Sequence, residues 1–324
     1  MSQQRPTAYE YRRMVRYGDC DASLNYYTPR AIDYAVEAVE GWFENVVEVS
    51  WSDLVSLYGM ELHFVHAGCE FQRTLTAGET VLAHVVVVSV EHSIITFSIS
   101  GMNQAGELCF RTTLMSCFVE RRQFKQIPIP PEYGERIERY RASCGAAGLE
   151  EEAGCPVTAD QNVPLPLAGR SGEVPFILQR RVVYGECGVS GTIYLPRVFD
   201  YLLEANGEWY GKFLGISWME QNILKRGQPF LQVTCDVLSR VVSGQLISLM
   251  FTVSRLGRSS ISYAVQGYDE KGTHCISGQL TACYSVEQNG ALKATPFPAE
   301  LREKITAYQA ACDEWLLERG IRAR

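Results

Sequence analysis

A chain of 324 residues, with 46% hydrophobic and 21% charged side chains, is long enough to bury the cores of two domains of ordinary size. Its formal net charge of −7 argues against a nucleic-acid-binding protein, because such proteins normally carry a basic field. The N-terminal segment MSQQRPTAYEYRR lacks the apolar core of a secretory signal, and the longest apolar run, residues 81–90, is too short to span a bilayer. We therefore expect a soluble, cytoplasmic protein with no membrane partner.

The first predicted elements are a strand, a polar turn and a long helix. Apolar and aromatic side chains at odd-numbered positions indicate a strand with one buried face, and they are Tyr9, Tyr11, Val15 and Tyr17. Gly18 ends this strand, and the turn Asp19-Cys20-Asp21 follows. A helix is expected over about 30–46, with Thr28 as its N-cap and Pro29 in its first turn. Its apolar stripe comprises Ile32, Ala35, Val39, Trp42 and Val46.

An antiparallel sheet is predicted after this helix. A polar connection, residues 48–62, leads into four strand-like runs separated by turn signals. These runs are residues 63–74, 80–90, 93–100 and 108–120. One long helix against an uninterrupted antiparallel meander is an α+β pattern, in which we expect the sheet to curl around the helix.

The chain then repeats itself. Shifted by 167 positions, residues 15–43 match residues 182–210 at 13 of 29 positions, and further matches continue to the pair Pro130 and Pro298. A period this long indicates a duplicated domain rather than a solenoid. We predict one domain over residues 1–141, a flexible Gly-, Pro- and Glu-rich linker over 142–175, and a second domain over 176–324 that ends in an amphipathic helix at 299–319.

Eleven cysteines indicate neither disulfides nor a metal site. The chain has no Cys-x-x-Cys spacing, the count is odd, and eight of the eleven form four repeat-equivalent pairs, three of them in strand-like runs. Small buried side chains in a reducing compartment explain this pattern, and we expect no metal and no cofactor. Cys20 is a weak candidate for a nucleophile, because the carboxylates on either side of it disfavour its thiolate.

Gly18-Asp19-Cys20-Asp21, followed by an aromatic pair, a proline and a helix with Trp-Phe near its end, resembles the 4-hydroxybenzoyl-CoA thioesterase family of hotdog-fold proteins. The run FVHAGCEFQRTLTAGETV, residues 64–81, is similar to that family's second strand and following turn. The resemblance covers nearly the whole chain outside the linker. It implies a double hotdog, with the two domains paired as a pseudo-dimer that is able to assemble further into a homo-oligomer.

The resemblance places the catalytic carboxylate of the family at Asp21, eight residues before Pro29. A thioester hydrolase needs a carboxylate to attack the carbonyl or to activate water, and backbone N–H groups to hold the oxyanion. We assign the second role to the N–H groups of Tyr27 and Thr28. The alternative for Asp21 is an ordinary turn-forming residue. For Asp19 a structural role is favoured, because its counterpart is Glu186.

Two further polar residues are candidates for the site. Asn25 is placed to hydrogen-bond the substrate or to position water, and the alternative is a turn cap. His66 lies on a predicted strand with Gln232 as its counterpart, so it is either a general base or a hydrogen-bonded structural histidine. The family continues after its aspartate with Pro-Ala-Gly, whereas this chain has Ala22-Ser23-Leu24, and the second repeat has Gly188 at the aspartate position. We therefore expect two unequal sites.

Four basic residues are candidates for binding the phosphates of coenzyme A or a phosphopantetheine arm. They are Arg73, Arg121, Arg122 and Lys125. The alternative is an ordinary solvated turn.

Three functions are compatible with the sequence. The first is a thioesterase that acts on an acyl or aroyl group carried by coenzyme A or an acyl carrier protein. The second is a dehydratase, cyclase or acyltransferase on the same fold, which would rest on His66 together with Glu37 or Glu204. The third is a non-catalytic scaffold that binds acyl thioesters.

Overall fold

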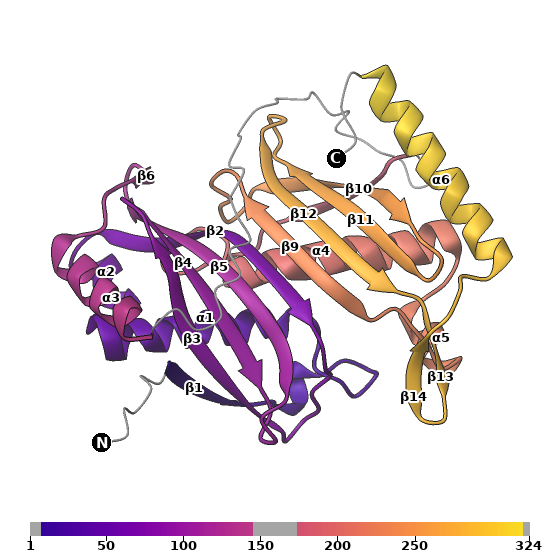
Figure 1. Cartoon of the computed structure of the whole chain (residues 1–324). Coiled ribbons are helices and arrows are strands. Elements are labelled where there is room, and N and C mark those ends of the chain that lie inside the picture. The colour runs from indigo at the N-terminus through magenta and orange to yellow at the C-terminus, as the bar shows by residue number, and fades with distance from the viewer. Residues whose placement is uncertain (1–7, 145–173, 320–324) are drawn as a thin grey trace. The chain divides into compact units, whose positions relative to one another are not determined.

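The computed structural model describes residues 8–144 and 174–319, and the chain forms two compact units (Figure 1). The break between the units lies outside the described residues. Most of the predicted linker lies outside the described residues. Its first three residues, 142–144, belong to a helix. The predicted domain limits otherwise stay predictions.

The first unit is one antiparallel sheet with a long helix against it. Its sheet order is β1-β3-β4-β5-β2, and the two-residue strand β6 pairs with β5. The strands are β1 (Tyr9–Met14), β2 (Met60–Phe71), β3 (Thr80–Val90), β4 (Ile94–Met102), β5 (Leu108–Glu120) and β6 (Lys125–Gln126). The helices are α1 (Arg30–Trp42), α2 (Trp51–Ser56) and α3 (Pro131–Cys144). The bounds of β3 and β5 agree with the prediction.

The central helix forms for the reason that the sequence suggested. Four members of its predicted stripe, Ile32, Ala35, Val39 and Trp42, are fully buried. A single π turn, Phe43–Val47, continues the helix to the predicted end. Glu48, with φ of 59°, then reverses the chain in the left-handed region.

Two predictions in this unit need correction. Tyr17 is 88% exposed, because a 3₁₀ turn, Tyr17–Asp19, replaces the end of the expected strand. The connection 48–62 is not irregular throughout, since Ser50 caps α2 by accepting a hydrogen bond from the Asp53 N–H at 3.0 Å. Leu54 of α2 is fully buried.

The second unit repeats this architecture. Its sheet order is β7-β10-β11-β12-β9, and α4 lies against one face of it (Figure 1). The main strands are β7 (Phe176–Arg181), β9 (Phe230–Val237), β10 (Leu246–Leu256), β11 (Ser260–Tyr268) and β12 (His274–Cys283). A small separate sheet has the order β14-β13-β8 and consists of β14 (Ala291–Ala294), β13 (Ser285–Gln288) and β8 (Arg226–Gly227). The helices are α4 (Leu195–Trp209), α5 (Trp218–Ile223) and α6 (Ala299–Glu318).

The duplication extends to irregularities of the strands. The β3–β4 register shifts between Val87 and Ser89, and the β10–β11 register shifts at the equivalent positions, Val253 and Arg255. Such bulges bend and twist a strand, so the curvature of both sheets is built in the same way.

Helices α3 and α6 are also equivalent, and each carries a tyrosine that ties the first strand of its unit to the neighbouring strand. The Tyr140 hydroxyl accepts from the Tyr9 N–H at 2.7 Å and donates to the Val85 carbonyl at 2.6 Å. Tyr308 bridges Phe176 and Phe251 in the same manner. The sequence predicted α6 but not α3.

No helix within residues 8–144 or 174–319 is both long and apolar enough to cross a membrane.

Candidate active site

The candidate site is built on a tight turn between β1 and α1, which we call the Asp21 turn (residues 20–26). Cys20 and Tyr26 form an isolated antiparallel bridge, and the Asp21 N–H donates to the Asn25 carbonyl at 2.9 Å. The Leu24 N–H donates to the Asp21 carbonyl at 3.0 Å, which closes the turn. Leu24 has a φ of 67°, a left-handed conformation that is unfavourable for a leucine. The backbone thus presents Asp21 at an exposed corner.

Local hydrogen bonds orient the Asp21 carboxylate. Its Oδ1 accepts from the Ser23 N–H at 2.8 Å and from the Ser23 hydroxyl at 2.6 Å. The Asn25 amide donates to Ser23 Oγ at 3.0 Å and to the Ser23 carbonyl at 3.3 Å. Asp21 Oδ2 has no partner among the described residues. One carboxylate oxygen is therefore held in place while the other stays accessible to a substrate or a water molecule.

The start of α1 offers one backbone donor rather than the two predicted. The Tyr27 N–H donates to the Asp19 carbonyl at 2.8 Å, so it is already engaged and the prediction for Tyr27 needs correction. The Thr28 N–H has no hydrogen-bond partner among the residues that the structure describes. Thr28 lies in the turn directly before α1, whose N-terminal end favours negative charge through the helix dipole. The Thr28 side chain does not cap the helix, whose N-cap position is Pro29.

Asp19 holds the Asp21 turn against the rest of the unit. Its Oδ2 accepts from the Arg16 N–H at 2.8 Å and from the Tyr34 hydroxyl at 3.0 Å, and it lies 3.5 Å from Arg13 Nη1. Burial raises the pKa of Tyr34, and the Asp19 carboxylate raises it further. These contacts join β1, the turn and α1, so Asp19 has the structural role that the sequence favoured.

The second repeat keeps this framework without the carboxylate of the turn. Glu186 accepts from the Val183 N–H at 3.0 Å, from the Tyr201 hydroxyl and from Arg180. Burial alone would raise the pKa of Glu186, but the hydrogen bonds from Tyr201 and Val183 and the charge of Arg180 together lower it. Gly188 stands at the position of Asp21, and a Cβ added there would meet nothing within 4 Å.

His66 lies in the middle of β2, next to an irregularity of the β2–β5 register between Phe64 and His66. It is half-buried, whereas its neighbour Ala67 is fully buried on the face towards the core. Both side-chain hydrogen bonds of Asp21 come from Ser23, so the described contacts do not join His66 to the Asp21 carboxylate. Its role as a base stays a prediction.

The four basic residues predicted to bind phosphates do not gather at one place. Arg73 follows the end of β2 and pairs with Glu107 at 2.9 Å, just before β5 begins. The other three follow the far end of β5, and they are Arg121, Arg122 and Lys125. Because β5 has 13 residues, the two groups lie roughly 40 Å apart along the strand. Of the four, only Arg73 is at the end of the sheet where the Asp21 turn pairs with Thr76.

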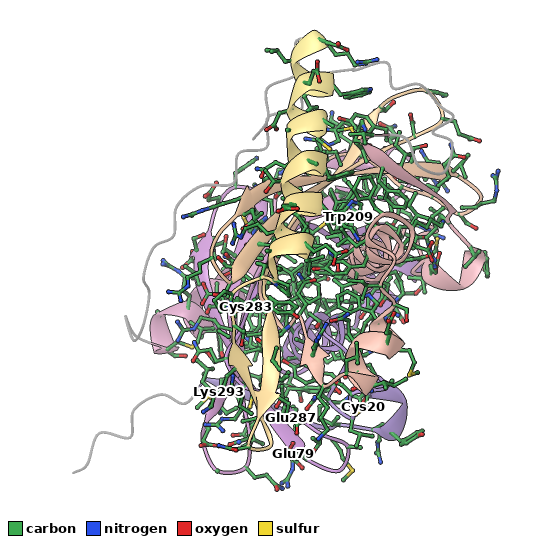
Figure 2. All side chains as sticks on the ribbon, turned by 90° about the vertical axis from the view of Figure 1, so that its right-hand side faces the viewer. Cys20, Glu79, Trp209, Cys283, Glu287 and Lys293 are labelled. Atoms are coloured by element: carbon green, nitrogen blue, oxygen red, sulfur yellow. The ribbon has the colours of Figure 1, made fainter. Side chains whose placement is uncertain are left out.

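Cys20, the cysteine of the Asp21 turn, is disfavoured as a competing nucleophile. Every cysteine among the described residues is a free thiol. Burial raises the pKa of the Cys20 thiol, and Asp19 and Asp21 raise it further, although a hydrogen bond to Ala77 acts in the opposite direction. Figure 2 labels Cys20 and Glu79 at this end of the first unit. Within residues 8–144 and 174–319, no group of three or more histidine, cysteine or acidic side chains is arranged to hold a metal ion.

No model of a known protein family matches the chain, and no curated protein sequence matches it. Several solved structures match the chain in fold. A Lactobacillus plantarum protein, provisionally assigned as an oleoyl thioesterase, has a TM-score of 0.66 and 12% identity, covering 87% of this chain and 98% of that one. An acyl-ACP thioesterase from Bacteroides thetaiotaomicron has a TM-score of 0.62 and 9% identity, with coverages of 85% and 96%. The 12:0-ACP thioesterase from Umbellularia californica has a TM-score of 0.62 and 11% identity, with coverages of 86% and 95%.

This likeness extends over most of each chain and establishes the fold, which is a double hotdog, as predicted. The structural relatives are thioesterases of the hotdog type. The more specific resemblance to 4-hydroxybenzoyl-CoA thioesterases stays a prediction.

The sequence analysis missed Ser23, which orients Asp21, and the pair Arg13 and Tyr34, which fixes Asp19. A signal for them was present, because all three are identical in the two repeats: Ser23 matches Ser190 and Tyr34 matches Tyr201. Arg13 matches Arg180, which makes the corresponding contact with Glu186. Residues retained in both copies belong here to the shared framework of the turn.

Proposed function

We propose that this protein is a thioesterase that hydrolyses an acyl or aroyl thioester of coenzyme A or of an acyl carrier protein, with Asp21 as its reactive carboxylate. The observation that carries the proposal is the arrangement at the Asp21 turn. A carboxylate with one oriented and one accessible oxygen lies seven residues before Thr28, whose N–H, at the entry to α1, has no hydrogen-bond partner within the described part of the chain. Structural relatives whose names include acyl-ACP thioesterase support the reaction class.

In the reaction, Asp21 Oδ2 takes a proton from a water molecule whose oxygen attacks the thioester carbonyl carbon. The carbonyl oxygen becomes an oxyanion, to which the Thr28 N–H donates a hydrogen bond. When the oxyanion reforms the carbonyl, the carbon–sulfur bond breaks and the thiolate leaves. Asp21 then gives its proton to the thiolate. The products are a carboxylic acid and a free thiol. Direct attack by Asp21 would give a mixed anhydride that water then hydrolyses, with the same balance.

Asn25 supports the turn in this proposal through Ser23, and its amide is not directed at Asp21. Arg73 is the basic residue best placed to meet a phosphate near the Asp21 turn, but it would have to exchange its ion pair with Glu107 for that contact. The remaining basic residues would act elsewhere on the substrate or its carrier.

A dehydratase with His66 as the base is less well supported. The carboxylates that it would need, Glu37 and Glu204, are both engaged within their own units. Glu37 pairs with Arg13 at 2.9 Å and accepts from the Tyr11 hydroxyl at 3.2 Å, and Glu204 pairs with Arg180.

The test is hydrolysis of a panel of acyl-CoA and acyl-ACP thioesters, measured as free thiol. The Asp21→Asn variant keeps the size of the side chain and its ability to accept from Ser23, so it should fold normally. It should lower kcat by at least about a hundredfold, because it removes the base. Hydrolysis at an undiminished rate by this variant would contradict the carboxylate mechanism, and thioester binding without hydrolysis by the unaltered protein would favour a scaffold.

A further inference from the structure

The turn of the second unit that corresponds to the Asp21 turn has the same backbone design, and we call it the Gly188 turn (residues 187–193). Cys187 and Ile193 form an isolated antiparallel bridge. The Gly191 N–H donates to the Gly188 carbonyl at 2.9 Å, which closes the turn. Each of these contacts has its equivalent in the Asp21 turn. The second repeat therefore lacks the carboxylate but keeps the turn that would present it.

Exposed positions show which residues the two repeats share for reasons other than packing. Between residues 15–43 and 182–210, five equivalent positions are exposed in both repeats. Three of them carry different residues, at positions 16 and 183, 21 and 188, and 22 and 189. The other two are identical, because Tyr17-Gly18 in the first repeat corresponds to Tyr184-Gly185 in the second. An exposed dipeptide has thus stayed the same where its exposed neighbours have changed.

The fold requires neither residue of this dipeptide. Tyr17 is 88% exposed and Tyr184 is 85% exposed. Among the residues that the structure describes, no hydrogen bond or ring contact involves either side chain. Gly18 and Gly185 do not have positive φ angles, so their backbone conformation does not call for glycine. A Cβ added at either glycine would meet nothing within 4 Å. Packing and backbone geometry therefore explain neither the tyrosine nor the glycine.

The two residue types suit a ligand that lies along the turn. A tyrosine offers an apolar ring face together with a hydroxyl group, and such side chains are enriched where proteins bind other molecules. A glycine leaves the backbone bare, so that another molecule is able to approach it closely. Because the second repeat keeps both residues without the carboxylate, the pattern indicates binding rather than the chemical step.

The comparison of the two turns also indicates which part of a thioester this ligand is. The acyl group differs from one thioester to another, whereas the pantetheine arm is common to coenzyme A and carrier proteins. Residues that meet the arm have a reason to stay the same in two sites, while those at the reacting carbonyl differ, as Asp21 and Gly188 do. The arm is a neutral chain, whose amide groups suit a phenol hydroxyl and whose methyl groups suit a ring face.

We propose that Tyr184 and Gly185 bind the pantetheine arm of a second thioester, in the way that Tyr17 and Gly18 bind the arm of the first. The chain then binds two thioesters and hydrolyses one of them, since Gly188 supplies no carboxylate. This inference rests on the proposed function, because it takes its ligand from the substrate class proposed for the Asp21 turn.

Calorimetric titration of the full chain with uncleavable analogues tests the proposal. Acetonyl-pantetheine is a thioether in which a methylene group between sulfur and carbonyl prevents hydrolysis, and it tests the arm alone. Acetonyl-CoA and a carrier protein that bears the same group test the two sources of the arm. We expect two sites per chain for acetonyl-pantetheine and for at least one source, which identifies that source. One site per chain for every probe, or two sites only for probes that carry more than the arm, would overturn the proposal.

Variants of the exposed tyrosines assign the two sites. Tyr184→Ala and Tyr17→Ala should each weaken one site about tenfold and leave the other unchanged. Tyr17→Ala should also raise KM about tenfold with a smaller change in kcat, as expected when a contact is made equally to substrate and transition state. Both variants should keep the melting temperature of the unaltered protein, because the replaced side chains are exposed. Undiminished affinity at both sites in either variant would overturn the proposal.

Tyr58→Ala is the matched control. Tyr58 is 54% exposed, but the second repeat has no tyrosine at the equivalent position, so both sites should bind as before. A loss equal to that of Tyr184→Ala would overturn the proposal. Titration and hydrolysis are separate measurements. Hydrolysis by a protein with one site would overturn this inference alone, whereas two sites without hydrolysis would support it and contradict the reaction proposed for Asp21.

Discussion

The role of Asp19 as a positioning residue can be tested with a control that the chain itself supplies. Asp19 and Glu186 occupy equivalent positions and hold equivalent turns, but only the first turn carries a carboxylate two residues further on. We expect Asp19→Asn to reduce both stability and turnover. Glu186→Gln should reduce stability alone, because Gly188 leaves nothing in the second turn to be misplaced.

The expected loss of stability follows from the contacts. Asp19 accepts hydrogen bonds at 2.8 Å and 3.0 Å and lies 3.5 Å from Arg13, with a side chain that is only 14% exposed. Asparagine still accepts one or both hydrogen bonds but loses the charge that strengthens them. Hydrogen bonds to charged groups contribute about 1.5–3 kcal/mol, so a loss of roughly 1–2 kcal/mol is reasonable. For a unit of this size, the melting temperature should fall by about 2–8 °C.

The expected loss of activity follows from the position of the turn. Without the Asp19 carboxylate, the turn keeps the backbone bonds from the Tyr27 N–H to the Asp19 carbonyl and from the Tyr26 N–H to the Leu75 carbonyl, but it loses its side-chain contact with Tyr34 of α1. A displacement of about 1 Å at a reacting group can lower the rate on the order of a hundredfold. We therefore expect kcat to fall by about tenfold to a hundredfold, with a much smaller change in KM. Asp19→Glu should recover part of the loss, because the second repeat makes the same contacts with a glutamate.

The assay is thiol release under saturating substrate, normalised to folded protein, together with thermal unfolding of each variant. The reasoning would be refuted if Asp19→Asn lowered the melting temperature but left kcat unchanged. It would be refuted equally if Glu186→Gln lowered kcat as much as Asp19→Asn does.

Three further predictions follow from the structure. Adding Gly188→Asp to the Asp21→Asn variant should leave the melting temperature unchanged, because a side chain at position 188 has open space around it. It should raise kcat roughly tenfold, because it places a carboxylate near the N-terminus of a helix. No recovery of kcat would mean that a carboxylate in this turn is not sufficient. The pKa of Glu186 is lowered below its ordinary 4.5, so the stability that this carboxylate contributes is present above about pH 4.5 and is lost as the pH falls through the folded-state value. In that pH range the free energy of unfolding should therefore depend less on pH for Glu186→Gln than for the unaltered protein. Parallel plots of unfolding free energy against pH for the two proteins would contradict this. Burial raises the pKa of Cys69 to about 12, so alkylation at pH 8 should spare this thiol in the folded protein, and rapid labelling of Cys69 would contradict its assignment as a buried structural residue. The Cys20→Ala variant should keep full activity, and an inactive variant would contradict the conclusion that Cys20 is not the nucleophile.

The sequence predicted those parts of the fold where period and repetition agree. The apolar stripe of α1 and the alternation of β3 and β5 each follow from burial of one face, so their limits were predicted well. Helix α3 was missed because its few buried side chains, Tyr133 and Ile137, leave a weak apolar stripe. The pair Pro130 and Pro298 would have indicated it, since α6 begins directly after Pro298.

The candidate site was predicted less completely, because it depends on backbone hydrogen bonds and on strand length. That Asp21 lies in an exposed turn follows from residue type and spacing. The Tyr27 N–H donates to the Asp19 carbonyl because the turn brings these two residues together. This backbone geometry could not be predicted from residue types alone. Arg73 and Arg121 are separated by the full length of β5. Both residues are basic and follow the end of a strand, so residue type and spacing did not reveal that they lie at opposite ends of the sheet.

The two turns also show what fusion permits. In a dimer of identical chains, every substitution appears at both sites at once, so the loss of a reactive carboxylate removes the whole activity in a single step. A tandem chain is free of that constraint, because each copy varies independently. Asp21 and Gly188, on turns of the same design, record such a departure from symmetry. Under the proposed function, one half of the molecule is thereby released to change, while the other keeps the reactive carboxylate.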